Sequence, residues 1–134
     1  MKYMLMMNAM TTGDVYAGVS GWQPADIETH ITFMKALSSS LRESGELLST
    51  EGLATLEHAR IVRADSNGTP ITDGVFPESK EFLAGYWIVD VDSPERANEI
   101  AARASASPGP GGTTLNMPIE VRPVMSGPPS DLLD

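Results

Sequence analysis

Cysteine is absent from the 134-residue sequence. The chain therefore forms no disulfide, no thiolate metal site and no cysteine nucleophile. Histidine is nearly as scarce, because His30 and His58 are the only two. Two imidazoles are too few for a multi-histidine metal centre, so a metal site within one chain would depend mainly on carboxylates. No phosphate loop, dinucleotide fingerprint or Gly-x-Ser-x-Gly motif occurs. We expect no bound metal and no cofactor.

Basic residues are also few. Nine lysines and arginines face eighteen aspartates and glutamates, which gives a formal net charge of -9. A surface of that sign repels phosphate backbones, so we expect no nucleic-acid partner. No apolar run approaches the roughly 20 residues of a membrane span, and none has the form of a secretory signal. We therefore expect no membrane association and a cytoplasmic location.

Hydrophobic residues make up 41% of the chain, which is ordinary for a globular protein with one core. We expect a single domain over residues 1–125. The Gly127-Pro128-Pro129 run cannot continue a sheet, so residues 126–134 are expected to form a C-terminal tail.

Strands are predicted where apolar, β-branched and aromatic side chains are dense, at residues 2–9, 84–91 and 119–124. Residues 46–50 are either a short strand or a turn. A hairpin is predicted around the turn at Asp65-Ser66-Asn67-Gly68, with residues 58–63 before it and 69–72 after it. The Ser/Pro/Gly-rich stretch at 105–117 is expected to be a mobile loop.

Two helices are predicted. The first covers residues 24–44, because Pro24 suits a first helical turn and Gly45 suits the position just past the end. The second begins after a serine cap at Ser93. Apolar side chains recur on the first helix at steps of three and four, at Ile27, Ile31, Met34, Leu37 and Leu41. The second helix has a narrow face of small apolar residues, at Ala97, Ile100, Ala101 and Ala104.

Without the hairpin, the order of elements is βαββαβ, which predicts an α+β fold of the ferredoxin-like type with an inserted β-hairpin. Two helices can cover only one face of the sheet, yet residues 3–7 and 86–91 are apolar on both sides. A second copy of the chain is the simplest cover for the other face. We therefore expect a homodimer with sheet against sheet, a dimeric α/β barrel.

The segment from Thr72 to Glu81 has the densest cluster of ionisable side chains. Asp73 and Glu78 are candidates for proton transfer or recognition, and Lys80 is a candidate ligand-binding cation. Phe76 would anchor the segment in the core. The alternative is that Asp73 stabilises a turn and Lys80 forms an exposed ion pair of little consequence.

This segment also resembles the signature of the DGPF-domain family, which belongs to the larger YCII-related superfamily. That signature is Asp-Gly-Pro-Phe, a small residue, then Glu-(Thr/Ser)-Lys-Glu. The chain has Asp73-Gly74-Val75-Phe76, then Pro77, then Glu78-Ser79-Lys80-Glu81, so Val75 replaces the family's proline. Further similar segments follow in order at 3–6, 44–47, 51–53, 85–93 and 119–124. The resemblance implies a ferredoxin-like fold and a dimeric barrel, but no particular reaction.

Some YCII-type enzymes use a His–Asp pair. The positions similar to that pair fall near Met34 and within residues 104–107, and neither holds the required residue. His30 nevertheless lies on the apolar stripe of the first helix, where an imidazole can exchange a proton near neutral pH; the alternative is a half-buried histidine bonded to the backbone. Glu51 follows the first helix and could face a cleft, although a structural role in a turn is an equal alternative. His58 is expected to be solvated.

Two functional hypotheses follow. The first is a cofactor-free small-molecule enzyme or binder, with its pocket between the first helix, the sheet and the Asp73 segment. In that site Asp73, Glu78 and His30 would be catalytic, and Lys80 and Glu51 would bind the ligand. The second is a non-catalytic interaction module linked to transcriptional regulation. The resemblance suggests this alternative, because similar genes neighbour those of sigma factors.

Overall fold

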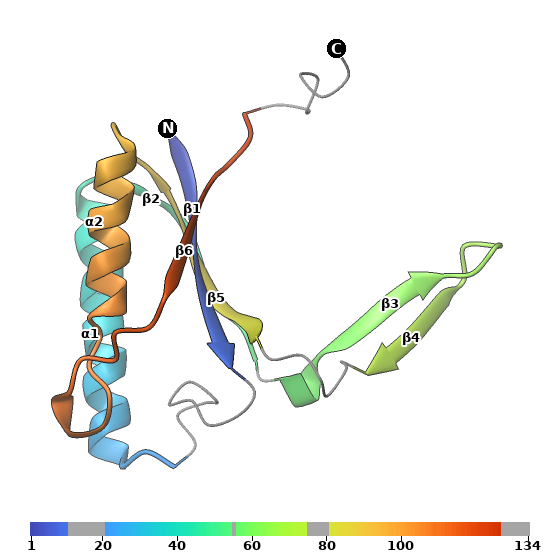
Figure 1. The fold of residues 1–134 in the computed structure, drawn as a ribbon, viewed down its shortest axis with the longest axis horizontal. Coiled ribbons are helices and arrows are strands. Elements are labelled where there is room, and N and C mark those ends of the chain that lie inside the picture. The colour runs from blue at the N-terminus through green and yellow to red at the C-terminus, as the bar shows by residue number, and fades with distance from the viewer. Residues whose placement is uncertain (11–20, 55, 75–80, 127–134) are drawn as a thin grey trace.

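The computed structural model describes residues 1–10, 21–54, 56–74 and 81–126, which form an α+β fold (Figure 1). The elements in chain order are β1 (Lys2–Met10), α1 (Pro24–Glu43), β2 (Leu47–Gly52), η1 (Leu56–His58), β3 (Arg60–Ala64), β4 (Pro70–Gly74), β5 (Glu81–Asp90), α2 (Pro94–Ser105), η2 (Pro110–Gly112) and β6 (Ile119–Pro123). Four strands form an antiparallel sheet in the order β2-β5-β1-β6. This order is compatible with the expected ferredoxin-like arrangement.

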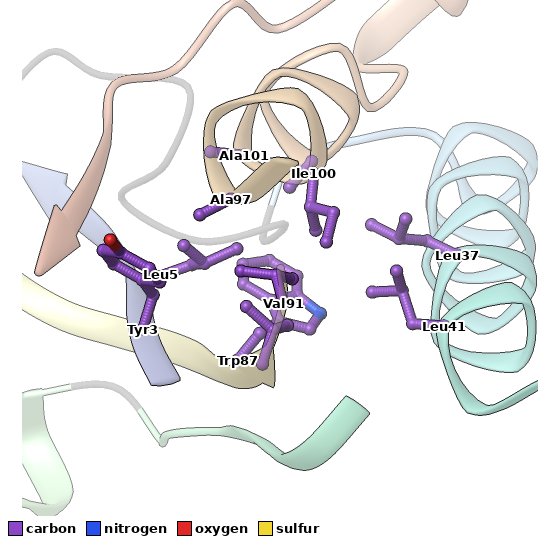
Figure 2. Packing of buried hydrophobic residues seen from close by; sticks show 11 residues of the cluster. Tyr3, Leu5, Leu37, Leu41, Trp87, Val91, Ala97, Ile100 and Ala101 are labelled. Carbon is purple, nitrogen blue, oxygen red and sulfur yellow. The ribbon is translucent and has the colours of Figure 1, made fainter. Parts of the chain in front are cut away.

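Both helices lie on the same side of the main sheet (Figure 1). Alternate residues of the two central strands therefore point into the core between sheet and helices, among them Leu5 of β1 and Val89 of β5, which are fully buried. Figure 2 shows Leu37 and Leu41 of α1 pointing toward Trp87 and the sheet.

The end of α1 follows from one glycine. Gly45 has φ 78°, a left-handed conformation that is costly for residues with a Cβ atom. The N–H of Gly45 donates to the Arg42 carbonyl and that of Glu46 to the Leu41 carbonyl, each at 3.0 Å. These two bonds make a Schellman motif, which satisfies carbonyls that the helix end leaves unpaired.

α2 begins as its sequence predicts. The Ser93 hydroxyl accepts a hydrogen bond from the Arg96 backbone N–H at 3.2 Å, and Pro94 occupies the first turn. The predicted apolar face is buried, with Ala97, Ile100 and Ala104 at 0% exposure. Small side chains on this face let the helix lie close to the sheet.

The predicted hairpin is confirmed: β3 and β4 pair with each other in a separate two-stranded sheet. The Asp65 carboxylate accepts hydrogen bonds from the N–H groups of Asn67 and Thr69 within the turn, and Gly68 has φ 81°. Every residue of β3 is exposed, and the hairpin extends away from the main sheet (Figure 1).

The segment at 105–117 is more structured than the expected mobile loop. Pro108 and Thr114 form an isolated bridge around η2, and the Leu115 N–H donates to the Ser107 carbonyl at 2.9 Å. Gly109 cannot be replaced freely, because a Cβ there would lie 2.6 Å from a Leu115 methyl carbon. Backbone pairing and close packing therefore order a stretch whose composition indicates flexibility.

The expected C-terminal tail lies mostly outside the described ranges, since Ser126 is the one described residue of it. Neither helix found in the described residues is long and apolar enough to cross a membrane.

An ion pair connects the end of α1 to the start of α2. The Arg96 guanidinium donates to both carboxylate oxygens of Glu46, at 2.8 and 2.9 Å, and also to Glu99 at 2.9 Å. The Ser44 hydroxyl donates to Glu46 at 2.7 Å. Mainly because of the Arg96 hydrogen bonds, the pKa of Glu46 falls from 4.5 to about 2, and the pKa of Arg96 is raised.

Glu46→Gln tests this pair. Because the folded-state pKa of Glu46 is depressed, its stabilisation is complete above about pH 4.5 and is lost as the pH falls toward about 2. We expect the variant to lose roughly 1–2 kcal/mol of unfolding free energy at pH 7, measured by urea denaturation. The difference from wild type should shrink between those two pH values. Glu99→Gln is the control, since that side chain is 64% exposed and should contribute less. A difference that stays constant down to pH 2 would contradict the assignment.

Candidate functional site

A cavity of about 600 Å³ lies between α1 and the part of the main sheet formed by β2 and β5. Small-molecule sites in proteins commonly have this volume. Its apolar wall includes Met7 of β1, Met34 of α1 and Trp87 of β5. Polar groups from α1 and β2 complete the lining, among them His30, Lys35, Ser38, Ser39, Arg42 and Thr50.

Small residues create this space. Gly52 of β2 and Gly85 of β5 are directly paired, so the sheet has no side chain at that position. A Cβ atom on Gly85 would lie 3.0 Å from the Glu51 carbonyl oxygen and 3.4 Å from the Met7 terminal methyl. On α1, the lining residues Ser38 and Ser39 also have small side chains. Small residues on both elements therefore leave space between the helix and the sheet.

His30 is half-buried at the cavity wall, and its orientation is fixed. Its Nδ1 lies 3.0 Å from the carbonyl oxygen of Pro108. A carbonyl can only accept a hydrogen bond, so the neutral ring has its proton on Nδ1 and its lone pair on Nε2. Trp22 packs against the ring edge-on, with centroids 5.6 Å apart and an interplanar angle of 86°.

The segment around Pro108, which accepts the His30 hydrogen bond, makes a second contact with α1. The N–H of Gly111 donates to the Asp26 carboxylate at 3.2 Å, one turn before His30. Pro108 and Gly111 therefore both contact the N-terminal half of the helix. The sequence predicts neither contact, because about eighty residues separate the partners.

Glu51 also borders the cavity, but the strand register directs its side chain elsewhere. It pairs with Tyr86, whereas the preceding Thr50 pairs with Trp87. Since Trp87 faces the helices (Figure 2), the alternation of strands points Thr50 to the cavity and Glu51 to the opposite face. The Thr50 hydroxyl donates to the Tyr86 carbonyl at 3.0 Å.

Asp73 is not among the residues that line the cavity. It lies on β4 of the exposed hairpin, where its carboxylate pairs with Arg63 at 3.1 Å. Exposed pairs of this kind contribute little stability. Phe76, Glu78 and Lys80 lie outside the described residues. Of the five residues singled out from the sequence, the structure brings together His30 and Glu51 at one cavity.

His58 is exposed, as expected, and lies 3.5 Å from the Glu57 carboxylate. Among the described residues, no three histidine, aspartate or glutamate side chains group in a way that could hold a metal ion.

The cationic side of the cavity was not predicted from the sequence. Lys35 and Arg42 lie on α1 next to the apolar stripe, at the helical spacing that places them on one face with Ser38. A signal for them does exist, since two of nine basic residues in an acidic chain share this face. That signal becomes informative only once the face is known to border a cavity.

The chain belongs to the family of the YCII-related domain, whose family model matches residues 1–109. The match includes β1, α1, β5, α2 and Pro108, and therefore the whole described lining of the cavity. A similar protein is "Uncharacterized protein R00369" of Rhizobium meliloti (strain 1021). It is 29% identical over 114 residues, which cover 84% of this chain and 87% of that protein.

The tautomer of His30 is directly measurable. Because Pro108 accepts from Nδ1, long-range ¹H–¹⁵N NMR spectra at alkaline pH should show His30 protonated on Nδ1. His58 is the internal reference, since its Nε2 faces Glu57 and is expected to hold the proton. An Nε2-protonated His30 would contradict the hydrogen bond on which the site is built.

Proposed function

We propose that this YCII-related protein, of the DGPF type, binds a small organic molecule in the cavity between α1 and β5 and acts on it by cofactor-free proton transfer through His30. The observation that supports this most is the fixed imidazole, bonded through Nδ1 to the Pro108 carbonyl at the wall of a cavity of ligand size. A catalytic base needs such an orienting partner on its other nitrogen.

In this mechanism Nε2 of His30 accepts a proton from a hydroxyl or an activated carbon of the bound molecule. The imidazolium that forms keeps its Nδ1–H bond to the Pro108 carbonyl, whose negative end stabilises the new charge. The same Nε2 then returns the proton to the product. The apolar wall of Met7, Met34 and Trp87 limits water around the reacting groups.

The other candidate residues are not the proton-transfer group in this mechanism. Glu51 borders the cavity, and its side chain can contact a ligand only where the molecule reaches around the edge of β2. Asp73 lies on the exposed hairpin, outside the described lining of the cavity, so this proposal gives it no part in the proton transfer. Glu78 and Lys80 lie outside the described residues and have no assigned place in this mechanism.

Blocking the cavity tests ligand binding. Ser39→Trp places an indole in the space, whereas Ala36→Trp places one on the exposed side of the same helix, outside the lining. Ligand-observed NMR with a library of small organic acids, alcohols and phenols should detect compounds that bind wild type and Ala36→Trp but not Ser39→Trp. Binding that survives in Ser39→Trp, or a library without any binder, would refute the site.

His30→Asn then separates binding from chemistry. The asparagine amide can still donate to the Pro108 carbonyl but cannot exchange a proton. For any compound that the wild type converts, we expect kcat to fall by roughly 10²–10⁴ while binding is retained. Unchanged turnover would remove His30 from the mechanism and leave a binding protein.

We also propose that two copies of the chain pair through the face of the main sheet that points away from the helices, as a ferredoxin-like dimeric barrel. Register supports this: Met4 pairs with Ile88 and Met6 with Tyr86, and all four alternate with core residues. Both helices lie on the other side (Figure 1), so no helix of the described ranges covers these half-buried side chains.

Light scattering tests the pairing. At micromolar concentration the wild type should have about twice the chain mass of 14.3 kDa. Met6→Lys places a charge at the centre of the outer face and should give a monomer. Val62→Lys is the matched control, because Val62 is 53% exposed but lies on the hairpin. A dimer disrupted by Val62→Lys and not by Met6→Lys would move the interface to the hairpin.

One observation favours the second candidate function, a non-catalytic interaction module linked to transcriptional regulation. The hairpin exposes three apolar side chains, Ile61, Val62 and Ile71, at 37%, 53% and 44%. An isolated two-stranded hairpin is marginal in water, so such a surface suits contact with another protein. This function becomes the better one if the cavity binds nothing.

A further inference from the structure

We infer that the ligand of the cavity is an amphipathic organic anion, a carboxylate attached to an apolar body. This inference rests on the proposed function, because it names the class of molecule that the same cavity takes. It depends on the combination of two cations, small hydroxyl side chains and an apolar wall within one cavity.

The cations come from one face of α1. Lys35 and Arg42 are seven positions apart, about two helical turns or about 10 Å along the axis, and both border the cavity. Ser38 and Ser39 lie between them. The long side chains of lysine and arginine can converge above the serines, where ammonium, guanidinium and hydroxyl groups all donate hydrogen bonds. A carboxylate accepts such bonds and matches the guanidinium in a two-point geometry.

The charges of the chain as a whole bear on whether Lys35 and Arg42 can bind an anion. The chain has a net charge of -9, and other cations such as Arg96 and Arg63 are paired with carboxylates. Within the described part of the chain, neither Lys35 nor Arg42 lies in a salt bridge or side-chain hydrogen bond. Their donors therefore remain available to a ligand, and they add two positive charges to one border of the cavity in an acidic protein.

The apolar part of the lining requires an apolar partner. Met7, Met34 and Trp87 present thioether and aromatic surfaces to the cavity. Methionine adapts its shape to flat or irregular apolar groups. A small inorganic anion would leave this wall and most of the 600 Å³ filled with water. A carboxylate with an aromatic or aliphatic body satisfies both sides.

A cationic ligand is the competing class, because among the described residues at the cavity border Glu51 is a carboxylate. The register pairs Glu51 with Tyr86 and directs its side chain to the opposite face, away from Lys35 and Arg42. A cation in the cavity would also lie beside two like charges. The geometry therefore favours the anion.

Three probes with one ring system separate these classes: 1-naphthoate, 1-naphthalenemethanol and 1-naphthylmethylammonium. By calorimetry or NMR titration, we expect naphthoate to bind about tenfold or more tighter than the alcohol, and the ammonium compound weakest. Lys35→Gln/Arg42→Gln should weaken naphthoate binding by about tenfold or more and leave the alcohol unchanged. The control, Lys2→Gln/Arg60→Gln, removes the same charge from two exposed sites outside the lining and should alter neither.

The outcomes distinguish this inference from the proposed function. Equal binding of naphthoate and alcohol, both lost in Ser39→Trp, would overturn the anion and keep the cavity as a site. Naphthoate binding that the Lys35/Arg42 variant retains would also overturn the inference, as would preference for the ammonium probe. Failure of all three probes, together with a library that yields no binder sensitive to Ser39→Trp, would instead overturn the proposed function.

Discussion

α1 packs into the core mainly through its C-terminal half, and the cavity opens beside this contact. Leu37 and Leu41 are buried against the sheet, whereas Ile31, on the same stripe two turns earlier, is 45% exposed. A helix held at one end by hydrophobic contacts needs other interactions to fix its remaining turns. The segment around η2 supplies them through the Pro108 carbonyl and the Gly111 N–H, so the same contacts that position α1 also orient His30.

Several contacts also fix the C-terminal end of α1. The Schellman motif at Gly45 turns the chain into β2, and Glu46 then binds the first turns of α2 through Arg96. Charge-assisted hydrogen bonds of this two-point kind restrict orientation as well as distance. Two fixed ends therefore set the separation of α1 from the sheet at the cavity. Burial and an ion pair fix one end, and hydrogen bonds between α1 side chains and the backbone around η2 fix the other.

Signals between neighbouring residues predicted the helices, the strands and their turns, but they did not predict the cavity site. Gly45, Ser93 and the Asp65–Gly68 turn act on neighbouring residues, so their effects could be predicted without knowing the fold. The contact of His30 with Pro108 joins residues 78 positions apart, and no periodicity encodes it. Composition was misleading at 105–117, where long-range backbone pairing orders a Gly/Pro-rich stretch. Charge density at Asp73 identifies polar residues but not the surface on which they lie, and the structure places Asp73 on the exposed hairpin.

The pleat of β5 explains how one strand can serve two surfaces at once. Trp87 points toward α1 and borders the cavity, while its neighbours Tyr86 and Ile88 point to the outer face. Gly85 interrupts this alternation with a position that has no side chain, beside Gly52 of the edge strand. A ligand in the cavity and a second copy on the outer face would thus be separated by a single sheet and would share β5. Because each surface takes alternate residues, such an assembly would constrain the sequence of β5 on both sides, and the strand is nearly continuously apolar in a protein that is otherwise strongly acidic.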